Sequence, residues 1–373
     1  MRIALIAPPF VSVPPRKYGG TELFIAQLAE GLQKLGNEVV VYANGESTVG
    51  VPVRWLYEKS QWPIQGEVYD SLKDLNHATW AVADAARTCD LVHINNAPGL
   101  CSSRFVNLPY VYTIHHPHED GLTQFYSYFP RISYVTISDF QRQRETRLPS
   151  VRTIQHGIDL SQYRLQESKE DYLAFIGRIA PVKGAHLAIE VARKAGIPLK
   201  IAGEVQPIFR DYYDRQIKPH VDGKFIEYVG EADLQDKNEL LGKARAMLFP
   251  IQWDEPFGLV QIEAMACGTP VLALPGGSVS EIVRDGLSGY VGTSVAELAR
   301  RASDLALPAA TVRQYVEANF SLDRMVSRYA ELYEEVVTSA YAEQVPARTS
   351  LMTEAAGTDE TDGDEFTESR AIA

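Results

Sequence analysis

Short apolar segments alternate with longer amphipathic segments through the first half of the chain. Residues 2–7 predict a buried strand, and a Pro- and Gly-rich loop over residues 8–20 follows it. Thr21 is a candidate N-cap for a helix that ends at Gly36 and carries apolar residues at helical spacing on one face. The same pattern predicts strands at residues 38–43, 90–95, 110–114 and 134–137 and a helix at residues 69–87.

The second half of the chain repeats this alternation. Strands are predicted at residues 172–176, 198–202, 225–229, 246–249 and 271–274, with helices at residues 184–195 and up to Ala244. Because alternating strands and helices form parallel βαβ units, the chain is predicted to be an α/β protein. Two such series predict two Rossmann-like domains, residues 1–160 and 161–321, with the polar stretch 161–170 as linker. A helix from Leu322 to about Tyr341 is expected in the segment 322–343.

The composition is that of an acidic globular protein. The 373 residues are 45% apolar and 23% charged, which allows two domains with a core each. The net charge of −12 argues against a general nucleic-acid binder. Residues 344–373 carry seven acidic side chains against Arg348 and Arg370, a local charge of −5, which leaves −7 for the remainder. This polar tail is predicted to be disordered.

The cysteines and the apolar segments indicate a cytoplasmic protein. Cys89, Cys101 and Cys267 form no C-x-x-C pair and no metal-binding spacing, so reduced thiols are expected. The apolar strand near the N-terminus is too short for a signal peptide. No apolar run approaches the roughly 18 residues of a membrane-spanning helix. Peripheral contact with a membrane surface stays open.

Two carboxylates mark the segment 253–271. Glu255 and Glu263 stand eight residues apart across a predicted junction between a loop and a helix. Glu255 precedes Pro256, which favours an extended conformation, and Pro256 is suited to the first turn of a helix. Gly258 permits close approach of a ligand to the backbone, and Gly268 is a candidate helix stop. Free N–H groups at the helix start form an anion site, so the segment suits a phosphate joined to polyhydroxylated rings.

This segment resembles the E-x7-E motif of retaining glycosyltransferases with the GT-B architecture, specifically family 4. The resemblance implies that Glu255 contacts the donor sugar and Glu263 the ribose of the nucleotide. The backbone between them, at Phe257, Gly258 and Leu259, would meet the diphosphate. The alternative is a buried α/β junction whose carboxylates are solvated or cap the helix.

Two cations follow a strand at residues 175–184. Arg178 and Lys183 lie five residues apart in a loop that begins at Gly177 and leads into a helix. Arginine binds phosphate in a bidentate manner and lysine supplies a point charge. The segment is similar to the family's G-R-x-x-x-x-K-G signature, which places both cations on the diphosphate. Solvated surface cations are the alternative.

Gly19 and Gly20 lie between the first strand and the first helix, where a backbone can approach an anion. The family has a similar glycine loop that faces the donor phosphates and the acceptor. The dinucleotide-binding G-x-G-x-x-G spacing is absent, and a purely structural turn is an equally good interpretation.

Three histidines, His115, His116 and His118, follow the strand at residues 110–114. Their spacing in a loop interrupted by Pro117 matches no known zinc pattern, although a metal site is one alternative and a loop without a special role another. The family has a T-x-H at this strand end, which implies that His115 lies beside the transferred sugar. Further along, His156 stands where family members usually have Asn, so no role is carried over to it.

No D-x-D sequence follows a predicted strand. Asp362-Gly363-Asp364 matches the letters but lies in the acidic tail. Cationic side chains and helix N–H groups can replace the charge of a metal ion, so transfer without a metal and without a cofactor is expected.

The resemblance covers residues 2–342 and predicts a GT-B fold, with two facing Rossmann-like domains and a C-terminal helix that crosses back onto the first. The implied activity is transfer of a hexose from a nucleotide-diphosphate sugar to an acceptor hydroxyl with retained anomeric configuration. The acceptor is expected to be a carbohydrate, a lipid-linked compound or another small molecule. A nucleotide-sugar epimerase of the same fold and a non-catalytic sugar-nucleotide-binding protein are the alternatives.

Overall fold

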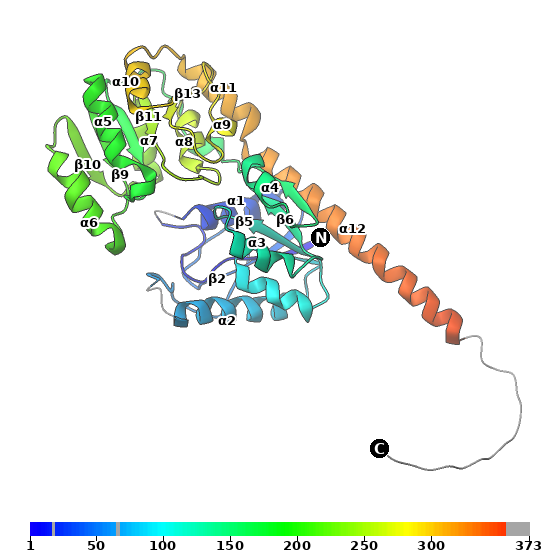
Figure 1. Ribbon diagram of the computed structural model, residues 1–373. Helices are drawn as coiled ribbons and strands as arrows, with labels where there is room; N and C mark the ends of the chain where they lie inside the picture. The colour runs from blue at the N-terminus through cyan, green and yellow to red at the C-terminus, as the bar shows by residue number, and fades with distance from the viewer. Residues whose placement is uncertain (17–18, 65–67, 356–373) are drawn as a thin grey trace, which may run out of the picture.

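Two parallel sheets, each covered by helices, form the body of the molecule (Figure 1). The computed structural model describes residues 1–16, 19–64 and 68–355, with the backbone alone for residues 343–355. The first sheet has the strand order β3-β2-β1-β4-β5-β6-β7. Its elements are β1 (Arg2–Ile6), α1 (Gly20–Lys34), β2 (Glu38–Ala43), β3 (Val53–Trp55), α2 (Val68–Ala85), β4 (Leu91–Ile94), β5 (Tyr110–Ile114), α3 (Asp120–Ser127), β6 (Ser133–Thr136), α4 (Asp139–Arg144) and β7 (Val151–Thr153).

The second sheet has the strand order β10-β9-β8-β11-β12-β13, and each neighbouring pair of strands in it is parallel. Its elements are β8 (Leu173–Ile176), α5 (Ala185–Ala195), β9 (Leu199–Ala202), α6 (Arg210–Tyr212), β10 (Ile226–Gly230), α7 (Leu234–Lys243), β11 (Ala246–Phe249), α8 (Leu259–Ala266), β12 (Val271–Ala273), α9 (Val279–Ile282), β13 (Gly289–Val291), α10 (Val295–Ser303) and α11 (Ala309–Asn319). The last helix is α12 (Leu322–Ala355).

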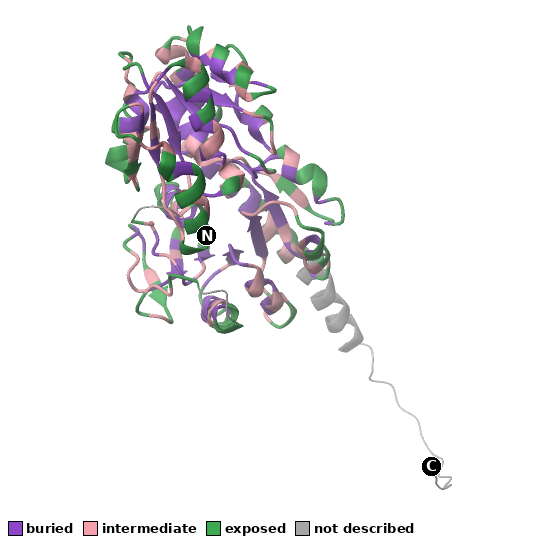
Figure 2. Ribbon diagram, turned by 60° about the vertical axis from the view of Figure 1, so that its left-hand side comes forward, coloured by how far each residue is buried: buried purple, intermediate pink, exposed green. Residues whose placement is uncertain are grey.

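Each sheet separates two apolar layers, because successive side chains of a strand point to opposite faces. In β1, Ile3 and Leu5 pack with α1 and α12, whereas Ala4 and Ile6 pack with α2. In β8, Ala174 joins the layer of α7, α8 and α11, and Phe175 joins that of α5 and α10. Burial on both faces explains why these strands are continuous apolar runs in the sequence. Figure 2 shows the buried strands inside layers whose outer faces are exposed.

Helix α12 returns from the second sheet to the first and packs along α1, which confirms the predicted crossing (Figure 1). The two helices approach closely at Gly31, where a Cβ would meet Val326 Cγ2 at 2.4 Å. Further along α12, the Tyr329 hydroxyl lies 2.9 Å from Thr113 Oγ1 and the Tyr333 hydroxyl 2.6 Å from His93 Nδ1. The helix is therefore part of the core of the first α/β unit.

Gly31→Ala is expected to lower the free energy of unfolding by about 1–3 kcal/mol, because the added methyl group overlaps Val326. The cost should exceed the gain of about 1 kcal/mol that alanine gives in a helix interior. Gly121→Ala in α3 is the matched control, since a Cβ there meets nothing within 4 Å, and it should leave stability unchanged or raise it. Urea unfolding measures both, and an unchanged midpoint for Gly31→Ala would contradict the close packing.

The structure corrects several predicted boundaries. Thr21 does not cap α1, which starts at Gly20 with Gly19 as its N-cap. Pro256 does not open a helix, because α8 starts at Leu259 after a left-handed Gly258. Helix α12 continues past Tyr341 to Ala355, so residues 344–355, assigned to a disordered tail, are helical. The predicted disorder of residues 356–373 falls outside the described residues.

Candidate active site

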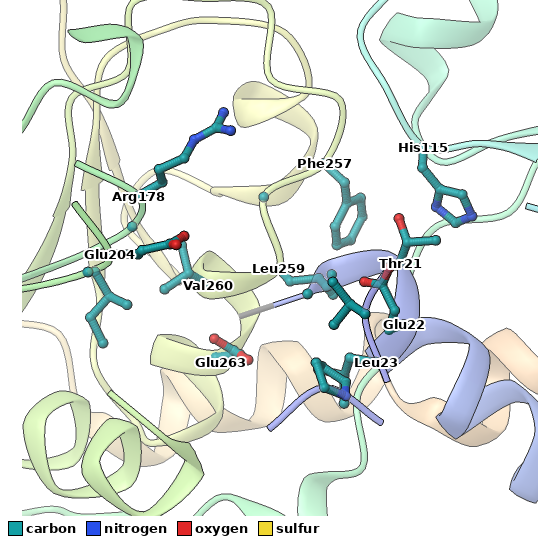
Figure 3. A pocket seen from close by; sticks show the side chains of 18 of the residues that line it. Thr21, Glu22, Leu23, His115, Arg178, Glu204, Phe257, Leu259, Val260 and Glu263 are labelled. Atoms are coloured by element: carbon teal, nitrogen blue, oxygen red, sulfur yellow. The ribbon is translucent and has the colours of Figure 1, made fainter. Parts of the chain in front are cut away.

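The predicted site residues come together in one cavity of about 770 Å³ that both α/β units line. Strand order reverses between β1 and β4 in the first sheet and between β8 and β11 in the second. Ligands of open α/β sheets bind at such points, outside the carboxyl ends of the strands. The predicted residues that line the cavity are Gly19, Gly20, His115, Arg178, Lys183, Glu255, Phe257, Gly258, Leu259 and Glu263. In Figure 3, Thr21 and His115 lie on one side of the cavity, and Arg178 and Glu263 lie across from them.

Glu255 is held at the cavity wall by two donors. Its Oε2 accepts a hydrogen bond from Lys183 Nζ at 2.5 Å and another from Trp253 Nε1 at 2.8 Å. Lys183 also lies over the Trp253 ring, 4.5 Å from its centroid. The carboxylate is buried, and its Oε1 has no hydrogen-bond partner among the described residues. The group is therefore fixed in place with one oxygen available to a ligand hydroxyl.

Arg178 lines the same cavity without an ion-pair partner among the described residues. Its Nε is buried and has no hydrogen-bond acceptor, and the guanidinium lies 5.7 Å from the centroid of the Phe209 ring. Leaving a buried charged donor unsatisfied is costly, so an anionic ligand would complete this site. The arrangement favours a phosphate group close to Arg178.

The N-terminus of α8 supplies backbone donors to the cavity. Gly258 adopts φ +82° and ψ 68°, which turns the chain sharply into the helix at a backbone conformation that other residues rarely adopt. The N–H groups of Leu259 and Val260 have no backbone acceptor within the part of the chain that the structure describes. Because helix N-termini attract anions, these groups complement the charge of Arg178.

Glu263 lies one helical turn into α8 and is almost completely buried. Lys237 Nζ donates to both carboxylate oxygens, at 3.0 Å and 3.1 Å, and the Tyr163 hydroxyl donates to Oε1 at 2.9 Å. These donors hold the group as an acceptor-only carboxylate at the cavity wall, which suits it to a pair of sugar hydroxyls. Burial, together with the Glu263 charge, raises the pKa of the Tyr163 hydroxyl well above its ordinary value.

His115 faces the cavity from the first α/β unit. Its Nε2 lies 2.9 Å from Asn95 Oδ1, and the Asn95 amide nitrogen donates to the Ile6 carbonyl at 3.2 Å. This second bond orients the amide, so Nε2 of His115 carries the proton and Nδ1 has the lone pair. Burial, and then the neighbouring His156, lowers the pKa of His115 well below its ordinary value. The ring is thus neutral at physiological pH.

The glycine loop of the first unit faces the start of α8. A Cβ at Gly20 would lie 3.6 Å from Leu259 Cδ1, so the two ligand-facing turns are close neighbours. Glu22 follows in the first turn of α1 and lines the cavity, and burial raises the pKa of its carboxyl group. The structure therefore adds a carboxyl group on the side opposite Arg178 (Figure 3).

The described residues contain no group of three or more histidine, cysteine or acidic side chains arranged to hold a metal ion. The three neighbouring histidines contact different partners. His116 Nε2 lies 2.5 Å from the Tyr126 hydroxyl and His118 Nδ1 lies 3.0 Å from Glu145 Oε1, whereas His115 bonds to Asn95. They do not converge on one point. Asp362 and Asp364 fall outside the described residues.

Stability is expected to fall as the pH drops below about 6.5, the ordinary histidine pKa. Burial lowers the pKa of both His93 and His156 to about 3, so between pH 6.5 and 3 the unfolded chain binds a proton that the folded chain does not. Each ring then lowers the free energy of unfolding by about 1.4 kcal/mol for every pH unit below 6.5. Above pH 6.5 the rings are neutral in both states and this loss is absent. Urea unfolding at pH 7, 6 and 5 gives the free energy of unfolding as a function of pH. This free energy should fall less steeply with decreasing pH in His156→Gln than in the wild type. An equal slope in both proteins would contradict the buried neutral state of His156.

Several site residues have no local signal in the sequence. Tyr163 and Lys237 reach Glu263 from 100 and 26 residues away, and Asn95 reaches His115 from 20 residues away. Only the tertiary fold brings them together. Trp253 is different, because it lies only two residues before Glu255 in the sequence and belongs to the same local segment.

Two protein families match the chain, each over one part of it. Residues 18–162 match Glycosyltransferase Family 4, and residues 160–318 match Glycosyl transferases group 1. The two matches together span all of the predicted site residues that line the cavity, from Gly19 to Glu263. None of the helices in the described part of the chain has the length and apolar character needed to cross a membrane.

Individual relatives are similar over nearly the whole chain. A phosphatidyl-myo-inositol mannosyltransferase of Mycobacterium leprae is 26% identical, over 92% of this chain and 100% of the relative. The crystal structure of AviGT4, a glycosyltransferase involved in Avilamycin A biosynthesis, is 25% identical with a TM-score of 0.68 and covers 90% of this chain and 98% of its own. HepE of Anabaena, solved in complex with UDP and glucose, has the same fold at 18% identity, with a TM-score of 0.72 over 90% of this chain and 100% of its own.

Proposed function

The chain belongs to the group 1, family 4 glycosyltransferases with the GT-B fold, and from this we propose that it transfers a hexose from a nucleotide-diphosphate sugar to an acceptor hydroxyl with retention of anomeric configuration. In this reaction the bond between the anomeric carbon and the diphosphate oxygen breaks, and the acceptor oxygen bonds to the same carbon. The hydroxyl proton passes to the departing diphosphate. The products are a glycoside and a nucleoside diphosphate.

The observation that carries the proposal is the Lys183–Glu255 pair, in the same cavity as Arg178 and Glu263. Arg178, Lys183 and the N-terminus of α8 stabilise the negative charge of the departing diphosphate. Glu255 accepts hydrogen bonds from sugar hydroxyls through its free Oε1, and Glu263 binds the ribose. His115 lines the opposite face. These cations and N–H groups supply the charge that a metal ion supplies in other transferases, so we propose transfer without a metal or another cofactor.

A screen of nucleotide sugars by thermal stabilisation tests the donor site. A ligand that binds only the folded state raises stability by about 2.7 kcal/mol at 100 times its Kd. We expect one nucleoside-diphosphate hexose and its nucleoside diphosphate to raise the melting temperature equally with and without EDTA. If no nucleotide sugar shifts the wild-type protein, the donor-site proposal fails, and a shift that EDTA abolishes contradicts metal-independent binding.

The expected acceptor is a carbohydrate, a lipid-linked compound or another small molecule. The surface beside the cavity favours an amphiphilic acceptor. Exposed apolar side chains gather in the segment that leads from β3 into α2, and Trp62 of this segment also lines the cavity. We propose that the apolar part of a lipid-like acceptor lies along it, with peripheral membrane contact as a consequence. The exposed side chains are Trp55, Leu56, Trp62, Ile64, Val68, Tyr69, Leu72 and Leu75.

Alkyl glycosides with one sugar and increasing chain length test this acceptor. We expect kcat/KM to rise with chain length, by at most about fourfold per methylene, which is the limit for full burial. The variant Val68→Ser/Leu72→Ser should flatten the dependence, whereas Phe105→Ser, an exposed apolar residue outside the segment, should leave it unchanged. A rate independent of chain length in the wild type would exclude the apolar acceptor.

A further inference from the structure

Helix α4 of the first α/β unit contacts the second unit at both of its ends. At its start, the Glu281 carboxylate of α9 accepts hydrogen bonds from the backbone N–H groups of Asp139 at 2.9 Å and Phe140 at 2.5 Å. At its end, Arg144 Nη2 lies 3.3 Å from Asp254 Oδ2. In Figure 1, α4 lies on the side of the first unit that faces the second. The helix therefore joins two segments of the second unit.

The Glu281 contact is the stronger of the two. Its two carboxylate oxygens each accept from a different backbone N–H group, and Gln155 Nε2 adds a donor at 3.4 Å. Hydrogen bonds to a charged acceptor are roughly twice as strong as neutral ones, and backbone donors lose no side-chain freedom. The Arg144–Asp254 pair joins two side chains that are each about half exposed, so it contributes little. Glu281 is therefore the main contact between α4 and the second unit.

In the second unit, Glu281 is tied to the loop of Glu255. Ser278, the N-cap of α9, donates its backbone N–H to the Glu255 carbonyl at 2.9 Å. Its hydroxyl donates to the Phe257 carbonyl at 3.1 Å. Gly277 adopts φ +57°, and a Cβ there would lie 2.4 Å from the Glu255 nitrogen. Because of this close packing, the position of α9 determines that of Glu255.

In the first unit, α4 is tied to the loop of His115. Gln141 of α4 is buried, and its amide nitrogen donates to the carbonyls of Ile114 at 3.1 Å and His116 at 2.7 Å. These two residues flank His115 in the chain. The Gln141 amide oxygen accepts from the Ile137 N–H at 2.9 Å, which fixes the orientation of the amide. The position of α4 therefore determines that of His115.

We propose that Glu281 is a positioning residue that sets the separation of His115 and Glu255 across the cavity. It acts through α4 on the first unit and through Ser278 on the second, and it does not itself line the cavity. This deepens the proposed function and rests on it. Glu281 makes the two walls of the cavity, which belong to different units, into one reaction site.

Loss of this contact should affect transfer and spare donor binding. The proposed contacts with the diphosphate and the ribose, at Arg178, Lys183 and Glu263, all belong to the second unit. The acceptor is expected to enter from the first unit, so its position relative to the donor depends on the contact between the units. A displacement of about 1 Å between reacting groups can cost about 100-fold in rate. Water needs no such positioning, so hydrolysis of the donor should fall less than transfer.

Three variants test the contact itself. Glu281→Ala removes both acceptor oxygens, and Glu281→Gln keeps one of them. Glu297→Ala is the matched control, because Glu297 also accepts from a backbone N–H, that of Thr293 at 2.8 Å, but within the second unit and away from the cavity. Hydrogen–deuterium exchange of residues 137–145 should be roughly 10- to 100-fold faster in Glu281→Ala, the size of a hydrogen bond to a charged group. In Glu297→Ala it should match the wild type.

Kinetics with the nucleotide hexose that binds best and an octyl glycoside as acceptor test the effect on the reaction. Glu281→Ala should lower kcat for transfer by about 10- to 100-fold, and Glu281→Gln by less. The Kd for the nucleoside diphosphate should stay close to the wild-type value. Hydrolysis of the donor without acceptor should fall less than transfer does. A residue with a merely structural role would lower donor binding, hydrolysis and transfer together.

Equal exchange of residues 137–145 in Glu281→Ala and the wild type would overturn the proposal, because the carboxylate then does not hold α4. Wild-type transfer in a Glu281→Ala protein whose α4 exchanges faster would also overturn it, as would parallel losses of donor binding, hydrolysis and transfer. If Glu281→Ala fails to fold, Glu281→Gln decides by the same comparisons. Failure of the proposed function looks different, because the wild type then neither binds nor turns over any nucleotide sugar, while the difference in exchange persists.

Discussion

Replacing Arg178 with methionine is expected to lower kcat by about 100- to 1,000-fold, as removal of one donor to a developing anion does. The guanidinium has no ion-pair partner among the described residues, and its Nε is buried without an acceptor. The side chain is therefore held ready for a ligand anion and does not stabilise the fold. Steady-state kinetics with the best nucleotide sugar and saturating acceptor measure the effect.

The melting temperature of Arg178→Met without ligand should stay close to that of the wild type, because the guanidinium forms no ion pair among the described residues and methionine can keep an apolar contact with the Phe209 ring. Arg215→Met is the matched control, since Arg215 is an exposed arginine whose ion-pair partner among the described residues is exposed Asp211, four residues earlier in the chain. Wild-type kcat in Arg178→Met, or a loss of the same size in Arg215→Met, would remove Arg178 from the site.

Glu255→Gln is expected to lower kcat by about tenfold or more, the size of one lost transition-state contact. Glutamine keeps an acceptor for Lys183 and Trp253, so the loop should stay in place, but the negative charge beside the sugar is lost. Affinity for the nucleoside diphosphate should change little, because the proposed contact of Glu255 is with the sugar. Kinetics and calorimetric titration with the nucleoside diphosphate separate the two effects.

Glu38→Gln serves as the control, because Glu38 forms a largely exposed salt bridge with Arg2, remote in sequence from the site. If Glu255→Gln retains wild-type kcat, Glu255 is a structural partner of Lys183 and nothing more. A second comparison uses Lys183→Met, which leaves Glu255 buried without its cation and is expected to be less stable than Glu255→Gln.

The sequence alone was sufficient to predict those parts of the site whose residues are close together along the chain. The alternating apolar runs predicted both parallel sheets, because strands buried on two faces must be apolar throughout. Glu255 and Glu263 flank one helix start, and Arg178 and Lys183 flank one loop, so their spacing is local. The switch points of the two sheets then bring these loops to one cavity.

Contacts between segments that are far apart in the sequence could not be predicted from the pattern of apolar and polar residues. Tyr163 and Lys237 hold Glu263 through tertiary structure, and no periodicity or motif marks either residue. His156 departs from the Asn that is usual in the family, but its contacts with the rings of Phe257 and His115 depend on the tertiary fold. Helix ends also differ from the prediction where backbone geometry decides them, as at Gly258, after whose left-handed conformation α8 starts at Leu259, three residues beyond Pro256.

The central claim is that this cavity transfers a hexose from a nucleotide-diphosphate sugar with retention. NMR spectroscopy of a reaction with the best-binding nucleotide sugar and an acceptor glycoside tests it most directly, because the spectrum reports every product and the anomeric coupling. The account predicts a nucleoside diphosphate and a glycoside with the anomeric configuration of the donor. An inverted glycoside would contradict retention, an isomerised donor would identify an epimerase, and an unchanged donor would indicate a protein that binds without catalysis.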